Sequence, residues 1–376
     1  MEHLLAWLLL KNAPGVGNRV FKELLERFGH PDAVIKASEK ALLEVKGIRP
    51  QTAAFLKSRT IPQQVLQDLE AVRQHNAGIV TLADENYPAM LTQIPDPPPF
   101  LYVMGELFSD DRAVAVVGAR NASQYGLQTA NRLARELAGC GVTVVSGMAR
   151  GIDTAAHEGA LSANGRTIAV AGCGLGRVYP PENKELFESI ASTGAVVSEF
   201  PMNTPPNAGN FPARNRIISG LCVGVVVVEA AARSGSLITA RMALEQNREV
   251  MAVPGSVASF KSAGTHNLIK QGAALVENAR DVLAHLAGPL LQTPQAAGIF
   301  QGQESAPCRT SMEAGLPLTD LQKRVLKALG PYPVQMDELC RELSLPAGEL
   351  AAALLELEIM GLAVQEPGKM FSAKQG

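Results

Sequence analysis

The central part of the chain alternates short apolar runs with stretches that have the spacing of amphipathic helices. The runs are almost continuously apolar, as expected of parallel strands that are buried on both faces. The predicted strands are 113–117, 142–146, 167–171, 195–198, 223–230, 250–253 and 274–276. This alternation predicts an α/β fold with a doubly wound, mostly parallel sheet of Rossmann type.

Residues 1–75 have a different pattern, that of short helices interrupted by glycines. The segments LLLKNAPGVGNRVFKELLERFG and ALLEVKGIRPQTAAFLKS each place a glycine turn between two apolar helices. Turns of this helix-hairpin-helix kind can hold a nucleic-acid phosphate, although two helical hairpins that only pack on each other have the same pattern. We therefore predict a small helix-hairpin-helix or SAM-like domain (1–75) before a Rossmann-like core (76–285). The core begins with a strand at 79–82, a proline-rich bend and a strand around PFLYVMGE.

The periodicity stops after residue 285. Residues 286–316 are rich in Pro, Gly, Gln and Ser, which predicts a flexible linker. Residues 317–376 then give three helices and a hairpin, the pattern of a winged helix. The third helix, within 346–361, contains no Lys or Arg but has Glu349, Glu356 and Glu358, which DNA phosphates would repel. We expect a module that contacts protein rather than a DNA reader.

The composition excludes several classes of protein. Hydrophobic residues make up 47% and charged residues 19%, so the whole chain is not disordered. No apolar run reaches the ~18–20 residues of a membrane span, and the first residues lack the features of a signal peptide. The five cysteines lie about 30 or more residues apart, a spacing that matches neither a metal site nor a disulfide framework. We predict a cytoplasmic protein with no membrane contact and no metal or other cofactor.

The net charge of −2 hides an uneven distribution along the chain. Residues 112–285 carry 16 Lys and Arg against 12 Asp and Glu, whereas both flanking regions are net acidic. Thirteen of these 16 cations are arginine, whose planar fork suits phosphate. General arginine usage in the genome would give the same bias, so the bias only indicates where to look.

Glycine, arginine and serine gather directly after the predicted strands, where open α/β sheets bind their ligands. These loops include VGARNASQYG (117–126), SGMARGIDTAAH (146–157), EAAARSGSLITAR (229–241) and VPGS (253–256). In FPARNRIISG (211–220), an extended segment would point Arg214 and Arg216 to one face. The ensemble predicts an extended surface for an anionic ligand. Its candidate residues are Gly118, Arg120, Gly147, Gly151, Arg214, Asn215, Arg216, Ser234 and Ser236. Ser123 is expected to cap the helix that follows Arg120.

Evidence for an enzyme is weaker. Asp153 and His157 are spaced for a general-base pair, but an Asp in a first helical turn and a His with a structural hydrogen bond are more common. The glycines of GCGLGRVYPPEN (172–183) do not form a dinucleotide fingerprint, because Pro180 and Pro181 prevent a helix from starting directly after them. No P-loop motif occurs, which excludes a P-loop NTPase. We therefore expect that the protein is not an enzyme.

Several of these segments together resemble the bacterial DNA-processing family DprA, also called Smf. They are VGARNASQYG, SGMARGIDTAAHEGAL, YPPEN, SEFP, FPARNRIISGL, EAAARSGSLITARMALEQNREVMAVPG and GTHNLIKQGA, spread over about residues 80–285. The resemblance implies a dimeric, non-catalytic protein that binds single-stranded DNA, protects it from nucleases and loads the recombinase RecA onto it in natural transformation. Phe211, Tyr125 and Tyr179 are candidate base-stacking residues.

The resemblance also implies roles for individual residues. Arg120 resembles the family arginine that holds a DNA phosphate, and the 146–153 and 214–216 segments resemble other parts of that pocket. Pro181 stands where many members have lysine, and Arg177 or Lys184 would then supply the charge. The candidates added in this way are Ser146, Arg150, Gly174, Arg177 and Lys184. The alternative is a nucleotide-binding or nucleotide-cleaving enzyme related to lysine-decarboxylase-like proteins, with Asp153, His157 and Glu229 as its active residues.

Overall fold

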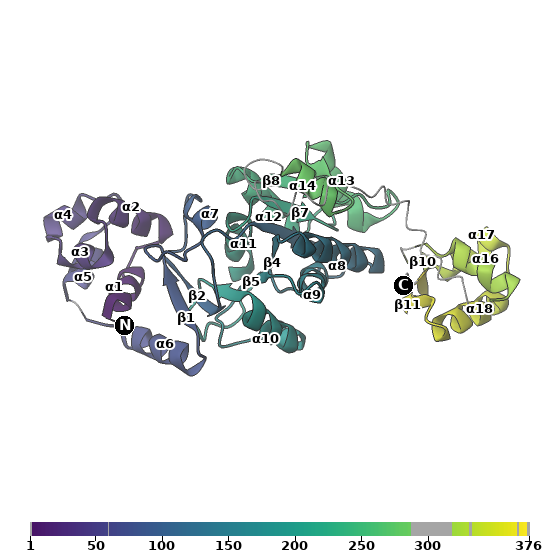
Figure 1. Ribbon diagram of the computed structural model, residues 1–376, viewed down its shortest axis with the longest axis horizontal. Coiled ribbons are helices and arrows are strands. Elements are labelled where there is room, and N and C mark those ends of the chain that lie inside the picture. Colours follow the sequence, from purple (N-terminus) through teal and green to yellow (C-terminus); the bar gives the residue numbers. More distant parts are fainter. Residues whose placement is uncertain (1, 59, 287–317, 331–332, 367, 374–376) are drawn as a thin grey trace.

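The structure, a computed structural model, describes residues 2–58, 60–286, 318–330, 333–366 and 368–373 (Figure 1). The predicted linker, 286–316, lies outside these residues except for Leu286. Leu286 is buried and packs in the core beside α14 (Ala279–His285).

A nine-stranded sheet forms the centre of the described chain (Figure 1). Its parallel part has the order β6-β5-β4-β3-β7-β8-β9, and β2 and β1 continue it on the β6 side with antiparallel pairing. The strands are β1 (Gly78–Thr81), β2 (Phe100–Gly105), β3 (Ala113–Val117), β4 (Thr143–Ser146), β5 (Thr167–Val170), β6 (Ala195–Ser198), β7 (Gly224–Val227), β8 (Glu249–Ala252) and β9 (Ala274–Leu275). The predicted α/β class and mostly parallel, doubly wound sheet are confirmed.

The strand order changes direction between β3 and β7. From β3 the chain continues to β4 on one side, whereas β7, β8 and β9 follow one another on the other side. Connections that leave two neighbouring strands in opposite directions open a crevice at the carboxyl ends of those strands. This switch point positions the candidate site.

Helices cover both faces of the sheet because successive strand residues point to opposite faces. Val114 and Val116 of β3 pack in the cluster that includes α8 (Gln124–Gly139), α9 (Ile152–Ser162) and α14. Ala115 and Val117 pack in the opposite cluster with α7 (Ala89–Thr92), α11 (Asn210–Gly220), α12 (Ser236–Glu245) and α13 (Ala263–Lys270). α10 (Lys184–Thr193) covers β2, β5 and β6.

The N-terminal helices share a core with this end of the sheet. They are α1 (Glu2–Lys11), α2 (Asn18–Phe28), α3 (Pro31–Lys36), α4 (Glu39–Leu43), α5 (Pro50–Ser58) and α6 (Gln63–Gln74). Trp7 stacks on Phe21 with ring centroids 5.5 Å apart. On α6, the Asp68 carboxylate accepts hydrogen bonds from the Tyr102 hydroxyl and, at 2.7 Å, from the Met202 N–H. A buried polar contact therefore joins α6 to β2 and to the loop after β6.

The C-terminal residues form a winged helix with its own core around Val325, Leu339, Leu354 and Phe371. It contains α16 (Asp320–Ala328), β10 (Val334–Gln335), α17 (Met336–Leu343), α18 (Ala347–Ile359), β11 (Ala363–Glu366) and β12 (Met370–Ala373). The three helices and the hairpin agree with the sequence-based prediction. It missed β10, a two-residue strand that pairs with β12.

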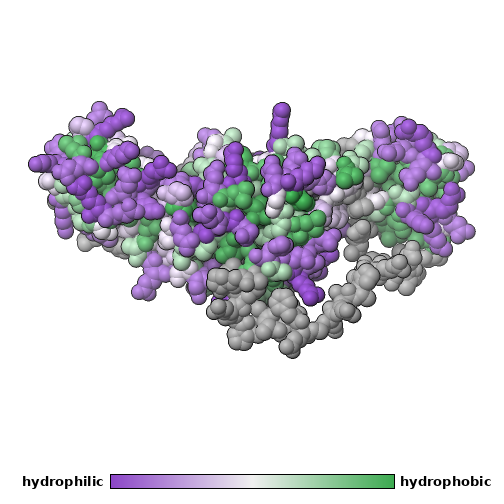
Figure 2. Space-filling model, turned by 90° about the horizontal axis from the view of Figure 1, so that it is seen from above, coloured by the Kyte–Doolittle hydropathy of each residue, from purple (hydrophilic) through white to green (hydrophobic). Residues whose placement is uncertain are grey.

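Apolar side chains reach the surface in several places between polar and charged ones (Figure 2). Among the described residues, the most exposed large ones are Val257, Ile359 and Phe260, at 93%, 78% and 74%. Val257 and Phe260 share one loop of the core, and Ile359 lies on α18. No helix in the described ranges combines the length and the apolar character needed to span a bilayer.

Candidate functional site

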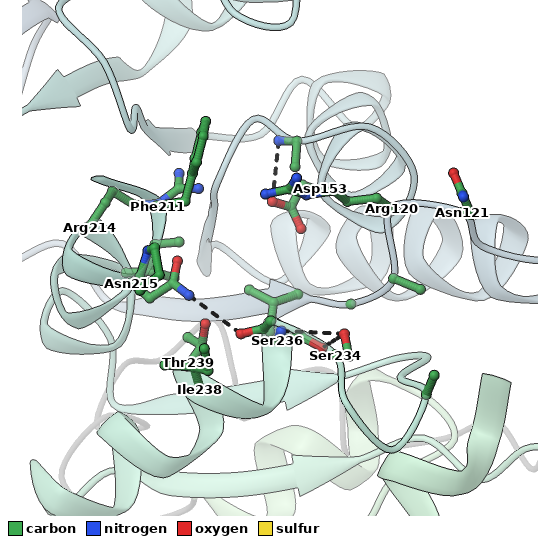
Figure 3. Close-up of a pocket in the computed structure, with 18 of the residues that line it drawn as sticks. Arg120, Asn121, Asp153, Phe211, Arg214, Asn215, Ser234, Ser236, Ile238 and Thr239 are labelled. Carbon is green, nitrogen blue, oxygen red and sulfur yellow. Dashed lines mark hydrogen bonds between the residues drawn. The ribbon is translucent and has the colours of Figure 1, made fainter. Parts of the chain in front are cut away.

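A pocket of about 800 Å³ opens at the carboxyl ends of the strands, beside the switch point. Its walls come from the loop after β3, the first turns of α11 and the turn between β7 and α12 (Figure 3). These segments lie far apart in the sequence and meet only because of the strand order. Six of the residues predicted to contact an anionic ligand line the pocket: Gly118, Arg120, Arg214, Asn215, Ser234 and Ser236. The stacking candidates Phe211 and Tyr179 and the enzyme candidate Asp153 line it too.

The loop after β3 is held at the end where α8 begins, by two hydrogen bonds of Ser123. Ser123 caps α8 as predicted, because its hydroxyl accepts a hydrogen bond from the Gly126 N–H at 3.1 Å. The Ser123 N–H in turn donates to the Glu229 carboxylate at 2.8 Å. This anchoring leaves Arg120 with an exposed side chain at the pocket.

Arg120 lies over an aromatic ring. Its guanidinium carbon is 5.2 Å from the centroid of Phe211, and the Phe211 ring is 5.6 Å from that of Tyr179. A guanidinium that stacks by its face keeps its N–H edge for a ligand. Tyr179 is 41% exposed, so one cation and two aromatic rings stand together at the pocket. The third aromatic candidate, Tyr125, instead donates its hydroxyl to the Pro254 carbonyl at 3.2 Å.

Arg214 is a buried cation. It donates to the Gly147 carbonyl at 2.6 Å and to the Val170 carbonyl, and its side chain is almost fully buried. Burial lowers the pKa of Arg214 to about 10, while the neighbouring Asp153 raises it. Arg214 therefore stays charged at neutral pH beside the Asp153 carboxylate, and its hydrogen bonds hold two strand ends.

The prediction that Arg214 and Arg216 point to one face of an extended segment is wrong. Both belong to the helix α11, on which residues two positions apart face different directions. Arg216 forms ion pairs with Glu199 and, at 3.3 Å, with Asp96, and it does not line the pocket.

The loop after β4 does not offer the anion cradle that its glycines predicted. The N–H groups of Gly147 and Ala149 already donate to the Asp153 carboxylate, at 3.1 and 3.3 Å. Ser146 is buried and donates its hydroxyl to the Val116 carbonyl. Gly151 has φ +79°, and a Cβ there would lie 2.4 Å from the Ala119 carbonyl oxygen. These residues shape the loop behind the pocket.

The remaining candidates lie outside the pocket lining. Gly174 packs against the backbone of Pro201 and Met202, and the exposed Arg150 pairs with Glu182. Lys184 begins α10 and lies 4.0 Å from Glu188, and Arg177 is exposed two residues before Tyr179. Neither Lys184 nor Arg177, which the resemblance suggested as sources of charge, lines the pocket.

The three residues that were considered as active residues of an enzyme make structural hydrogen bonds instead. His157 is fully buried with Nδ1 2.7 Å from the Thr167 hydroxyl, and burial lowers its pKa to about 3, so it is neutral at physiological pH. Asp153 accepts the two loop N–H groups described above, and Glu229 accepts that of Ser123. Within the described ranges, no three His, Cys, Asp or Glu side chains are grouped as a metal site would need.

Four further residues line the pocket without having been predicted as site residues: Asn121, Thr239, Phe260 and Lys261. For Lys261 a signal was present, since it is a cation in the segment after a predicted strand. Phe260 beside it had no pattern to mark it, because an isolated aromatic residue is usually part of a core.

Comparison with known proteins assigns the family. The family described as DNA recombination-mediator protein A matches residues 78–287, and the DprA winged helix domain matches residues 310–369. The chain is 38% identical to protein Smf of Synechocystis sp. over 390 aligned positions, gaps included, and the alignment covers 98% of each protein.

The chain belongs to the DprA/Smf family.

Solved structures of the DprA family agree with this fold. DprA of Streptococcus pneumoniae is 37% identical, with a TM-score of 0.65 over 73% of this chain and 95% of that one. DprA of Helicobacter pylori, studied for its single-stranded DNA binding mode, is 32% identical to this chain. Its TM-score is 0.50, and the match covers 56% of this chain and 95% of that one. Every residue that lines the pocket falls within the 78–287 match, so the pocket belongs to the part of the chain shared across DprA proteins.

Proposed function

We propose that this DprA protein binds single-stranded DNA in the pocket at the switch point and acts without catalysis. The observation that carries the proposal is Arg120, exposed at the pocket and stacked on Phe211 beside Tyr179. Proteins that bind single strands combine cations for the backbone with aromatic faces for the bases. The DprA of Helicobacter pylori has been studied for its single-stranded DNA binding mode, and this supports the same ligand for the present protein.

The neighbouring groups suit this ligand. The Arg120 fork can hold one phosphate with two charge-assisted hydrogen bonds. The hydroxyls of Ser234 and Ser236, 2.8 Å apart, and the Asn215 amide lie on the opposite wall in Figure 3 and add neutral donors and acceptors. The buried charge of Arg214 lies beside the Asp153 carboxylate, so Arg120 and Lys261 are the cations of the pocket lining that can attract an anion.

We further propose that the protein works as a homodimer that protects incoming strands and loads RecA onto them in natural transformation. The family resemblance supports these roles. For the dimer, β9 is the last strand of the sheet on its side, and its Leu275 is 47% exposed. An open edge strand with an exposed apolar side chain is suited to association with a second chain. A second copy would double the DNA surface and raise avidity.

Binding of a fluorescent oligo-dT of ~35 nucleotides, measured over a salt series, tests the DNA proposal. We expect affinity that falls as salt rises, since binding releases counterions. Arg120→Ala should weaken binding at least about tenfold and reduce the salt slope by about one ion. Arg135→Ala is the matched control, because it removes an equal charge from an exposed position further along α8. Its affinity for oligo-dT should stay within about twofold of that of the wild type.

Two outcomes would contradict the DNA proposal. One is the absence of binding even at low salt, and the other is an equal effect of the two arginine substitutions. Release of base or sugar phosphate from a nucleotide, abolished by Glu229→Gln, would favour the nucleotide-cleaving alternative instead.

The dimer and RecA proposals have separate tests. Light scattering should show a dimer for wild type and a monomer for Leu275→Glu, because a buried unpaired charge opposes association at an edge. With RecA added to strands coated by a single-strand-binding protein, the wild type should accelerate filament formation and Arg120→Ala should not. If the Arg120→Ala protein accelerates filament formation as the wild type does, RecA loading does not depend on this pocket.

A further inference from the structure

The loop between β8 and α13 carries an exposed aromatic residue at the pocket. Phe260 is 74% exposed, yet it lines the pocket together with the half-buried Lys261. An aromatic side chain in water forgoes the apolar contacts that usually stabilise such a residue. Phe260 therefore has a large flat face that is available to a ligand in the pocket.

The strand order places Phe260 across the pocket from Arg120. Arg120 follows β3 and Phe260 follows β8, and β7 lies between these two strands. At about 4.8 Å per strand, the two loops leave the sheet ~10 Å apart. Tyr179 follows β5, on the other side of β3. The aromatic residues of the pocket therefore stand along the sheet edge from the β5 side to the β8 side.

The ends of the Phe260 loop are fixed to the core. The Tyr125 hydroxyl donates to the Pro254 carbonyl, and His266 Nε2 lies 3.0 Å from the Gly255 carbonyl oxygen. At the other end, the Gly264 N–H donates to the Ala230 carbonyl at 2.7 Å. Phe260 itself begins the short 3-10 helix η2 (Phe260–Ser262), whose last residue is buried. The ring is presented from an anchored position.

We infer that Phe260 is a further base-stacking residue and that Lys261 contacts the adjoining phosphate, so that a single strand crosses the pocket from Tyr179 to Phe260. The inference rests on the proposed single-stranded DNA function. Stacking on an aromatic ring accepts every base, which suits a ligand without fixed sequence. Lys261 also supplies a cation on the β8 side of the pocket.

Tryptophan fluorescence gives a direct test of the contact. The protein has a single tryptophan, Trp7, which is buried among the N-terminal helices and contributes a constant background. We expect the indole introduced by Phe260→Trp to be quenched as oligo-dT saturates the protein. Val257→Trp is the matched control, because Val257 is on the same loop and more exposed but does not line the pocket. Its indole should keep its emission.

Affinity measurements give an independent test. Phe260→Ala should weaken oligo-dT binding about tenfold, the size expected for one lost stacking contact, and Val257→Ala should change it less than about twofold. Lys261→Gln should reduce the salt slope by about one ion. Phe260 and Val257 are exposed, so both alanine variants are expected to fold normally.

The outcomes separate this inference from the proposed function. If wild type binds and Arg120→Ala does not, while Phe260→Ala binds normally and Phe260→Trp is not quenched, the inference is overturned and the function stands. If the wild type fails to bind oligo-dT, the inference and the proposed DNA-binding function are both overturned. If Phe260→Ala converts a dimer to a monomer without changing the affinity of each protomer, the loop is a contact between copies and the inference is overturned.

Discussion

The Glu229 carboxylate accepts the Ser123 N–H at 2.8 Å and so joins the end of β7 to the start of α8, two points 106 residues apart in the sequence. Both side chains are buried. A Cβ added to Gly126 would lie 2.5 Å from the same carboxylate oxygen. The contact that holds the Arg120 loop therefore also requires glycine one turn into α8.

Gly126→Ala should lower the free energy of unfolding by about 2 kcal/mol, because a methyl group forced against a buried carboxylate must displace it. Gly139→Ala is the matched control at the other end of α8, where a Cβ would have no neighbour within 4 Å. That substitution should be neutral or stabilise by up to ~1 kcal/mol, since alanine favours helix. Urea denaturation measures the free energy of unfolding of both variants. If Gly126→Ala and Gly139→Ala changed it equally, the Glu229 contact would not restrict the residue at position 126.

Arg214→Lys should lower the free energy of unfolding by about 2–3 kcal/mol. Lysine keeps the charge but not the fork, so the buried Gly147 and Val170 carbonyls lose their donor. Arg233→Lys, at an exposed position, should change the stability by less than ~0.5 kcal/mol. Chemical denaturation followed by circular dichroism compares the two variants. An Arg214→Lys protein as stable as wild type would show that Arg214 serves the ligand and not the fold.

His157 should make the protein sensitive to acid. Its pKa is about 3 in the folded protein and near 6.5 when unfolded, so the unfolded state takes up the proton first as the pH falls. Stability from this group is complete above about pH 6.5 and is lost progressively toward pH 3, by about 2 kcal/mol at pH 5. Between about pH 7.5 and pH 5, the free energy of unfolding of His157→Gln should fall by about 2 kcal/mol less than that of the wild type. Urea denaturation at the two pH values measures this difference. Identical losses in the two proteins would contradict the assignment.

The winged helix should not contribute its third helix to DNA binding. Leu355 and Ile359 are 56% and 78% exposed on α18, which contains no Lys or Arg. A lysine placed at a position that faces DNA would strengthen binding and increase the salt slope. We expect Ile359→Lys to leave both the oligo-dT affinity and its salt slope unchanged. A tighter, more salt-dependent complex would place α18 next to the strand.

The strands were predictable because their signal is local. The run 113–117 coincides with β3, and the other predicted runs of the core overlap their strands within a few residues. Strands buried on both faces must be apolar throughout, and this leaves a mark in the sequence alone. α11 was missed because the segment 211–220 was predicted to be extended, although Pro212 is compatible with a helix. It lies in the first turn of the helix, where proline's missing N–H has no partner to lose.

The sequence by itself determined which loops hold arginine, glycine and serine, and the motif match was sufficient for the family. It did not determine what each side chain faces. Arg120, Arg214 and Arg216 look alike in the sequence, yet the first is exposed over Phe211, the second is buried against strand ends and the third is paired with Glu199.

Only the tertiary structure decided among these roles. The partners of each arginine come from elements far away in the sequence, and the order of the strands determines which of those elements become neighbours. The same holds for the glycine loop after β4, whose amides look free in the sequence but bind Asp153 in the fold. Local patterning specifies elements because backbone preferences and burial act over a few residues, whereas a site depends on hydrogen bonds and charges that meet only after the sheet has formed.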